Sequence, residues 1–185
     1  HVSAAAWQPL WPAPSARRHC AVAALQGRLY VVGGYDGRAH LSTVECYDSA
    51  QSSWLSLPPM HTARRGAAAV AACGILQVCG GHDGMSSVAV VEGYLPDSRT
   101  WQPLPSMPTA RRDCCAAVQC GHTFVFGGHN GGKHVPTAEC FHPNAGRWER
   151  LPPMPTARHG CAAAAINKAL YVVGGSDGWS YLATA

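Results

Sequence analysis

A spacing of 47 residues recurs along this chain and restricts it to a repeat architecture. A glycine doublet, a tryptophan and an arginine each return four times at this interval, and a glutamate returns three times, without any insertion. Because independent positions share one period, the fold must consist of copies of a single module. The repeated positions are Gly33-Gly34, Gly80-Gly81, Gly127-Gly128 and Gly174-Gly175; Trp7, Trp54, Trp101 and Trp148; Arg17, Arg64, Arg111 and Arg158; and Glu45, Glu92 and Glu139.

Each module is predicted to form four short strands. In the second copy, two apolar runs flank a Cys-Gly turn and end in the glycine doublet, which is a hairpin pattern. A polar loop, a third apolar run and a turn follow, and Trp101 opens the fourth strand. The segment 103–109 contains three prolines, which exclude a helix or a central strand there. The predicted strands are 67–72, 75–79, 90–95 and one starting at 101.

A sheet of this size cannot bury both of its faces alone, so its copies must pack against one another. Radial packing of such sheets gives a β-propeller. We therefore predict an all-β fold, a β-propeller of four-stranded antiparallel blades, in one domain over 1–185 with units at about 1–53, 54–100, 101–147 and 148–185. The glycine doublets are expected to permit close backbone approach, and the tryptophans to fill the wider outer space between blades.

The order of an apolar run, Gly-Gly, Tyr-Asp and a tryptophan seven residues after the tyrosine resembles the kelch repeat. The stretch from Leu29 to Met60 is most similar to the kelch domains of the BTB-kelch (kelch-like) proteins. The resemblance implies a six-bladed propeller that holds a substrate for a cullin-type ubiquitin ligase. Adaptor activity of that kind needs a BTB domain, which would lie outside this chain.

Only four units are present, and both ends of the sequence fall inside a repeat. We expect part of a six-bladed ring or a truncated chain; the alternative is a four-bladed ring in which the strand of Trp7 completes the last unit. Two departures from the repeat predict looser packing. Gln77 stands where Tyr30, Phe124 and Tyr171 stand in the other copies, and the first strands are rich in alanine.

The arginines and glutamates that recur in fixed phase are predicted to pair at the blade junctions, where a buried pair would mainly fix geometry. The alternative is that these arginines lie in turns and are solvated, in which case pairing contributes little.

Exposed positions that vary between copies are the candidates for partner binding. The turn before each first strand holds a basic residue, and the resemblance implies that it lies at the substrate-facing mouth. The loop after each glycine doublet supplies the other candidates, and arginine and aromatic side chains suit an interface with an acidic peptide. Asp36, Asp83, Asn130 and Asp177 in that loop are interpreted as turn formers. The predicted partner-binding residues are Arg18, Arg65, Arg112 and His159; Tyr35, His82, His129 and Ser176; and Arg38, His134 and Trp179.

The nine cysteines show no zinc spacing, so we read them as buried reduced thiols, which favours a cytoplasmic location. Two minor hypotheses concern other chemistry. His82 and His129 could face one opening and bind a metal, although no further ligand joins them. Cys114 and Cys115, beside Arg111 and Arg112, could have a lowered thiol pKa and sense oxidants. No cofactor and no metal site are predicted.

The predicted function is a non-catalytic protein-interaction module that binds a peptide, expected to be acidic, at the propeller mouth. The resemblance leaves two alternatives open: an actin-binding or cytoskeletal scaffold, and a kelch-propeller enzyme such as an oxidase or lyase, for which no catalytic cluster can be assembled. A formal charge of +4 without interleaved stacking aromatics argues against nucleic acid, and no apolar run is long enough to span a membrane.

Overall fold

The computed structural model describes residues 10–185 and contains only β-strands, turns and loops over that range. Its strands form three four-stranded antiparallel sheets and one two-stranded sheet, which we call blades 1 to 4. Within each complete blade the strands lie side by side in chain order. The strands are β1 (Ala21–Leu25), β2 (Arg28–Val32), β3 (Val44–Asp48) and β4 (Ser53–Leu57) in blade 1; β5 (Ala68–Ala72), β6 (Ile75–Cys79), β7 (Val91–Leu95) and β8 (Thr100–Leu104) in blade 2; β9 (Cys115–Gln119), β10 (His122–Phe126), β11 (Ala138–His142) and β12 (Arg147–Leu151) in blade 3; and β13 (Ala162–Ile166) and β14 (Ala169–Val173) in blade 4.

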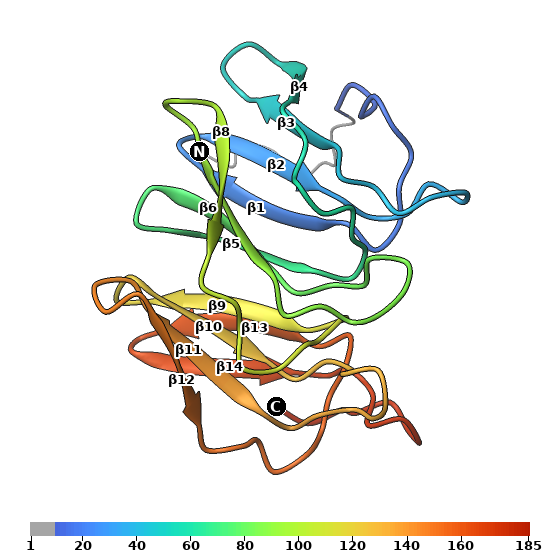
Figure 1. Cartoon of the computed structure of the whole chain (residues 1–185), viewed down its shortest axis with the longest axis vertical. Coiled ribbons are helices and arrows are strands. Elements are labelled where there is room, and N and C mark those ends of the chain that lie inside the picture. Colours follow the sequence, from blue (N-terminus) through green and yellow to red (C-terminus); the bar gives the residue numbers. More distant parts are fainter. Residues whose placement is uncertain (1–9) are drawn as a thin grey trace, which may run out of the picture.

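The blades are arranged around a common axis, because the first strand of each blade contacts the first strand of the next. These contacts run from β1 to β5, from β5 to β9 and from β9 to β13. Figure 1 shows the blades following one another in chain order, with the loops after the four glycine doublets on the same, right-hand side of the view. The predicted all-β architecture and its four-stranded blades are confirmed.

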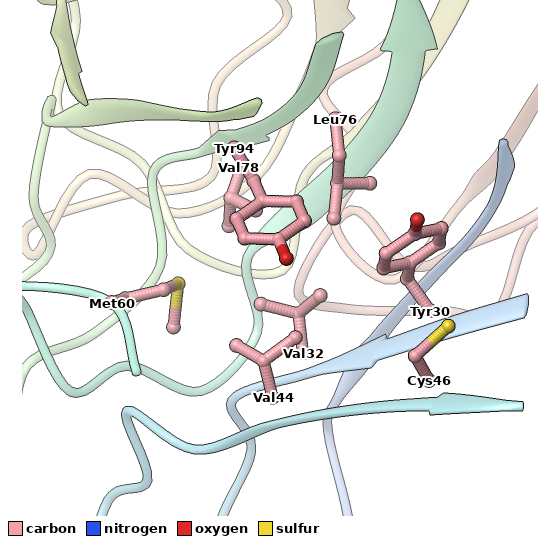
Figure 2. Packing of buried hydrophobic residues seen from close by; sticks show 8 residues of the cluster. All are labelled: Tyr30, Val32, Val44, Cys46, Met60, Leu76, Val78 and Tyr94. Carbon is pink, nitrogen blue, oxygen red and sulfur yellow. The ribbon is translucent and has the colours of Figure 1, made fainter. Parts of the chain in front are cut away.

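The junction between blades 1 and 2 shows how neighbouring blades share a core. Tyr30, Val32 and Cys46 of blade 1 face Leu76, Val78 and Tyr94 of blade 2 (Figure 2). The rings of Tyr30 and Tyr94 lie 6.1 Å apart between centroids, within the range of favourable aromatic contacts. Burial of these alternating side chains holds the blades together, since neither sheet could cover its apolar face by itself.

The tryptophans lie in the outermost strands, at the periphery of the blade junctions. Trp101 packs against the core between blades 1 and 2, and its indole Nε1 donates to the carbonyl of Pro58 over 2.8 Å. Trp148 repeats both features at the next junction, donating to Pro105 over 2.7 Å. Pro103 lies within β8, where an edge strand tolerates a residue without an N–H. Trp7 falls outside the described residues.

The glycine doublets permit the close approach expected of them. Gly33 has a φ of +61°, and a Cβ there would lie 2.5 Å from the carbonyl oxygen of Arg64, which leads into the next blade. The expected loose packing is wrong for the central blades. Gln77 is buried, and Ala68 and Ala72 of the alanine-rich strand β5 are buried too, because small side chains let the first strands approach one another near the axis.

Blade 4 presents an uncovered face. Tyr171 is 46% exposed, whereas its counterpart Tyr30 is 1% exposed beneath the following blade. Among residues 10–185, no strand pairing joins blade 4 to blade 1, and the strand expected at Trp7 lies outside this range. Over the same residues, no helix has the length and apolar character needed to cross a membrane.

Candidate functional site

Arg64 joins blade 1 to blade 2 through two different parts of the residue. Its backbone N–H donates to Leu41, and its carbonyl accepts from Gly34, both in blade 1. Its guanidinium lies inside blade 2, where it donates to the carbonyls of Gly80 at 3.0 Å and Val90 at 2.9 Å and pairs with Glu92. The side chain is fully buried, so every charged donor has to be matched inside the protein.

The other repeat arginines donate to the corresponding pair of backbone carbonyls, and two of them also pair with a glutamate. Arg17 lies 2.8 Å from Glu45 and Arg111 lies 3.0 Å from Glu139, while Arg158 donates to the carbonyl and the hydroxyl of Thr184 at 2.8 Å. Burial opposes ionisation of Glu92, but the backbone N–H of His61 and the Arg64 guanidinium outweigh it, and the pKa of Glu92 lies below its ordinary value. The alternative of solvated arginines is wrong for Arg64, Arg111 and Arg158, which are at most 5% exposed.

At the loop end of each blade, the predicted partner-binding positions come together in a short backbone ladder. In blade 1, Arg18 pairs with Tyr35 in an antiparallel backbone β-bridge, and Tyr35 pairs with His40 in a second one. The same three positions pair in every blade, so the basic turn and the loop after the glycines are neighbours although Arg18 and Tyr35 are 17 positions apart in the sequence. We call these twelve residues the rim: Arg18, Tyr35 and His40; Arg65, His82 and Ser87; Arg112, His129 and His134; His159, Ser176 and Tyr181.

Side-chain contacts connect the rim from one blade to the next. His40 of blade 1 lies against His82 of blade 2, with ring centroids 5.5 Å apart, and His134 of blade 3 stacks on His159 of blade 4 at 4.2 Å. Between blades 2 and 3, Ser87 Oγ donates to the carbonyl of His129 over 3.0 Å. The rim is therefore a continuous surface across all four blades.

The rim carries three guanidinium groups at partly accessible positions. Arg18 is exposed and lies over the ring of Tyr35, 5.2 Å from its centroid, in a cation–π contact. Arg65 and Arg112 are half-buried. Arg112 donates to Ser87 Oγ at 3.3 Å and lies 3.6 Å from the carboxylate of Asp113, so part of its charge is already balanced.

The loop beyond the glycine doublet is held by its aspartate or asparagine, as the turn interpretation predicts. Asp83 Oδ1 accepts the N–H groups of Met85 and Ser86, each at 2.8 Å, and these bonds lower the pKa of the Asp83 carboxyl. Arg38 and Trp179 lie at the tips of their loops and are exposed, Trp179 to 97%. They flank the rim without taking part in its ladder.

Two of the rim histidines, His82 and His129, are held in their neutral form. The Nδ1 atoms of His82 and His129 accept the N–H groups of Gly84 at 3.1 Å and Gly131 at 3.0 Å, bonds that a protonated imidazole could not accept. Burial, followed by the charge of Arg112, lowers the pKa of both rings. Burial also lowers the pKa of His40, with a contribution from Arg65.

The structure does not support the two chemical hypotheses drawn from the sequence, a metal site at His82 and His129 and a reactive thiol at Cys114 or Cys115. His82 and His129 belong to different histidine contacts, with His40 and with His134, and in the part of the chain that the structure describes no three His, Cys, Asp or Glu residues are grouped to hold a metal. The expected lowering of the thiol pKa at Cys114 and Cys115 is wrong. Both side chains are buried; burial raises the pKa of Cys114 to about 12, and a hydrogen bond with Cys161, together with burial, raises that of Cys115.

Sequence reasoning missed the hydroxyl groups that complete the arginine–glutamate sites. Ser15 donates to Glu45, and Thr109 Oγ1 donates to Glu139 Oε1 at 2.5 Å. A signal was available, because a hydroxyl residue stands two positions before each repeat arginine: Ser15, Thr62, Thr109 and Thr156.

The fold and the repeated junction define a kelch-repeat propeller. The chain matches the kelch motif four times, over residues 16–61, 63–108, 110–155 and 157–185, and it belongs to this family. In overall structure it is similar to YjhT, with a TM-score of 0.81 over 91% of this chain and 61% of that chain; at 17% sequence identity this likeness concerns the fold alone.

Among curated proteins, the chain is similar to kelch-like proteins over short segments. It is 68% identical to kelch-like protein 24 of Homo sapiens and of Rattus norvegicus over 28 residues, which is 15% of this chain and 5% of theirs. It is 46% identical to kelch-like protein 4 of Homo sapiens over 46 residues, or 25% of this chain and 6% of that protein. The chain thus spans a small fraction of the length of these relatives, and the resemblance to kelch-like domains is confirmed.

Proposed function

We propose that this chain is a non-catalytic interaction module that binds an acidic peptide segment of a partner protein along the rim. The observation that carries the proposal is the continuity of the rim, which offers guanidinium and imidazole groups from four blades on one end of the molecule. Kelch-repeat propellers are generally protein-interaction modules. The cationic side chains of the rim favour an acidic ligand for such a module.

Charge supports the preference for an acidic ligand. The arginines lower the pKa of His40, His82 and His129 by more than the neighbouring carboxylates raise it, so a positive field acts on these rings. Guanidinium groups bind carboxylates through paired, charge-assisted hydrogen bonds. The turn aspartates of the loops have their Oδ1 atoms engaged in their own turns, as Asp36 does with Arg38 and Ala39.

The test measures binding of a fluorescent Asp-rich peptide and of a Lys-rich peptide of equal length. We expect the acidic peptide to bind more tightly and to weaken as salt is raised, and the double substitution Arg65→Ala with Arg112→Ala to reduce affinity about tenfold or more. A control removes the same charge away from the rim, by Arg147→Ala with Arg150→Ala on the exposed positions of β12. Equal losses in the two double variants would argue against the rim as the site.

For the whole protein we propose substrate recognition in a cullin-type ubiquitin ligase, through a BTB domain that these 185 residues do not contain. Similarity to kelch-like proteins supports this role, and the free cysteines suit a reducing, cytoplasmic setting. The test is co-purification of a cullin with the kelch chain alone and with the chain joined to a BTB domain. Capture by the chain alone would contradict the proposed division of roles.

A further inference from the structure

The junction between blades 3 and 4 brings two cysteine sulfurs into contact. Cys115 begins β9, and Cys161 immediately precedes β13, the neighbouring first strand. Their Sγ atoms lie 3.0 Å apart, about 1 Å more than a disulfide bond. The fold brings the two sulfurs together, because these residues are 46 positions apart in the sequence.

Among the junctions that the structure describes, only the one between blades 3 and 4 holds cysteines at both of these positions. Cys115 occupies the repeat position of Ala21, Ala68 and Ala162, and Cys161 that of Cys20, Ala67 and Cys114. The corresponding pairs at the other described junctions are therefore Ala21 with Ala67, and Ala68 with Cys114. Because alanine serves the architecture at both positions, packing alone does not require two sulfurs between blades 3 and 4.

The two thiols have different surroundings. Cys115 is 7% exposed and packs with Ala117 and Phe126, whereas Cys161 is partly exposed. The hydrogen bond with Cys115 and the nearby charge of Arg158 lower the pKa of Cys161, whereas the same hydrogen bond and burial raise the pKa of Cys115. The accessible sulfur is thus the better thiolate, and the buried one keeps its proton.

We propose that Cys115 and Cys161 form a reversible disulfide in the presence of a peroxide, locking blade 3 to blade 4. The Cys161 thiolate attacks hydrogen peroxide, breaks its O–O bond and becomes a sulfenic acid, while the released hydroxide takes up a proton as water. The Cys115 sulfur then attacks the Cys161 sulfur, and the departing hydroxide accepts the Cys115 proton as a second water. Both cysteines are oxidised, the peroxide is reduced, and a dithiol reductant reverses the reaction.

Closing this bond restrains the segment between the two cysteines, which includes all of blade 3 and the link to blade 4. A disulfide across a loop of this length reduces the conformational entropy of the unfolded chain and so raises the stability of the folded state. The oxidised protein is expected to melt about 5 °C or more above the reduced protein. The rings of His134 and His159, which stack on the rim, span the same junction between blades 3 and 4.

The test treats dilute reduced protein with hydrogen peroxide, blocks free thiols, digests with trypsin and identifies linked peptides by mass. The expected product joins the peptide 113–133 to the peptide 159–168, and dithiothreitol separates them. Cys115→Ala and Cys161→Ala each abolish the product and the rise in melting temperature. Both substitutions install the residue that another repeat carries there, so folding is retained, which the melting of the reduced variants verifies.

Cys114→Ala and Cys120→Ala are the matched controls, since both residues lie in the same tryptic peptide as Cys115. They leave the linked product unchanged if Cys115 is the partner. Loss of the product in Cys114→Ala but not in Cys115→Ala would overturn the proposal, as would wild-type protein whose Cys161 stays free or is oxidised without forming a link.

Discussion

Thr123 donates a hydrogen bond from its Oγ1 to Gln77 Oε1 over 2.8 Å, across the junction between blades 2 and 3, and both side chains are buried. Each residue is a departure from the repeat. Gln77 replaces an aromatic residue, and Thr123 stands where Leu29, Leu76 and Leu170 stand. The two departures satisfy one another, because a buried polar group without a partner is costly and a bonded pair is tolerated.

Removing one member of this pair should therefore cost more than removing both. Gln77→Leu leaves the Thr123 hydroxyl buried without its acceptor and is expected to lower the free energy of unfolding by about 1–3 kcal/mol. Adding Thr123→Val, which removes the hydroxyl at nearly constant volume, should recover most of that loss. Urea unfolding of the two single variants and the double variant measures the coupling. Additive losses would show that the two residues do not depend on each other.

Substitutions of the adjacent residues Arg64 and Arg65 should affect stability differently, because Arg64 lies in the blade junction and Arg65 lies on the rim. Arg64→Ala leaves Glu92 buried without its guanidinium partner and removes donors to Gly80 and Val90, so we expect a loss of about 3–5 kcal/mol in the free energy of unfolding. Arg65→Ala truncates a half-buried rim side chain and should change stability by less than about 0.5 kcal/mol. Thermal and urea unfolding check both values. Equal stability of the two variants would contradict the junction role of Arg64.

Close approach at the glycine doublet makes Gly33 less replaceable than a turn glycine with a similar φ. Gly33→Ala adds a left-handed backbone penalty and a contact of 2.5 Å with the Arg64 carbonyl oxygen, for about 2–5 kcal/mol in total. Gly27→Ala, at φ +73° with nothing within 4 Å, should cost only the backbone penalty, about 1–2 kcal/mol. Urea unfolding of the two variants measures the difference in the free energy of unfolding that the contact with the Arg64 carbonyl causes. Equal losses in the two variants would show that this contact contributes nothing.

Much of the fold was predictable because the chain contains four copies of its own module. The period located the strands of blade 2 to within one residue at most ends, as for the predicted 75–79 and the observed β6 (Ile75–Cys79). The phase shared by Arg64 and Glu92 predicted their pairing before any distance was known. Comparing copies succeeds where each copy has the same neighbours.

Contacts between unequal positions of different copies were not predictable in this way. Comparison of the copies predicts that Gln77 loosens the packing, because its partner Thr123 is itself a departure from the repeat in the next blade. Cys115 and Cys161 differ by 46 positions instead of 47, so aligning the copies separates them. The stacking of His134 on His159 likewise brings together two different positions of the repeat from neighbouring blades, which only the packing of one blade on the next makes adjacent.

The rim histidines predict opposite effects of pH on stability and on binding. Because the folded state lowers the pKa of His40, His82, His129 and His134 below the ordinary 6.5, the unfolded chain takes up protons first as the pH falls. Their contribution to stability is therefore complete above about pH 6.5 and is lost as the pH falls through the lowered values. The ligand-free protein should melt at a lower temperature at pH 5.5 than at pH 7.5.

Binding of an acidic peptide should strengthen over the same interval, since each imidazole that gains a proton adds a positive charge to the rim. Asp-rich peptides keep their charge above pH 5, and the lowered pKa values of Asp36, Asp83 and Asp177 keep the loop carboxylates ionised, so the histidines alone titrate there. Peptide affinity measured between pH 7.5 and 5.5 checks the direction. The double substitution His82→Gln with His129→Gln should flatten the dependence while retaining a side-chain oxygen for the Gly84 and Gly131 N–H groups. An affinity that falls on acidification would contradict a cationic rim as the binding surface.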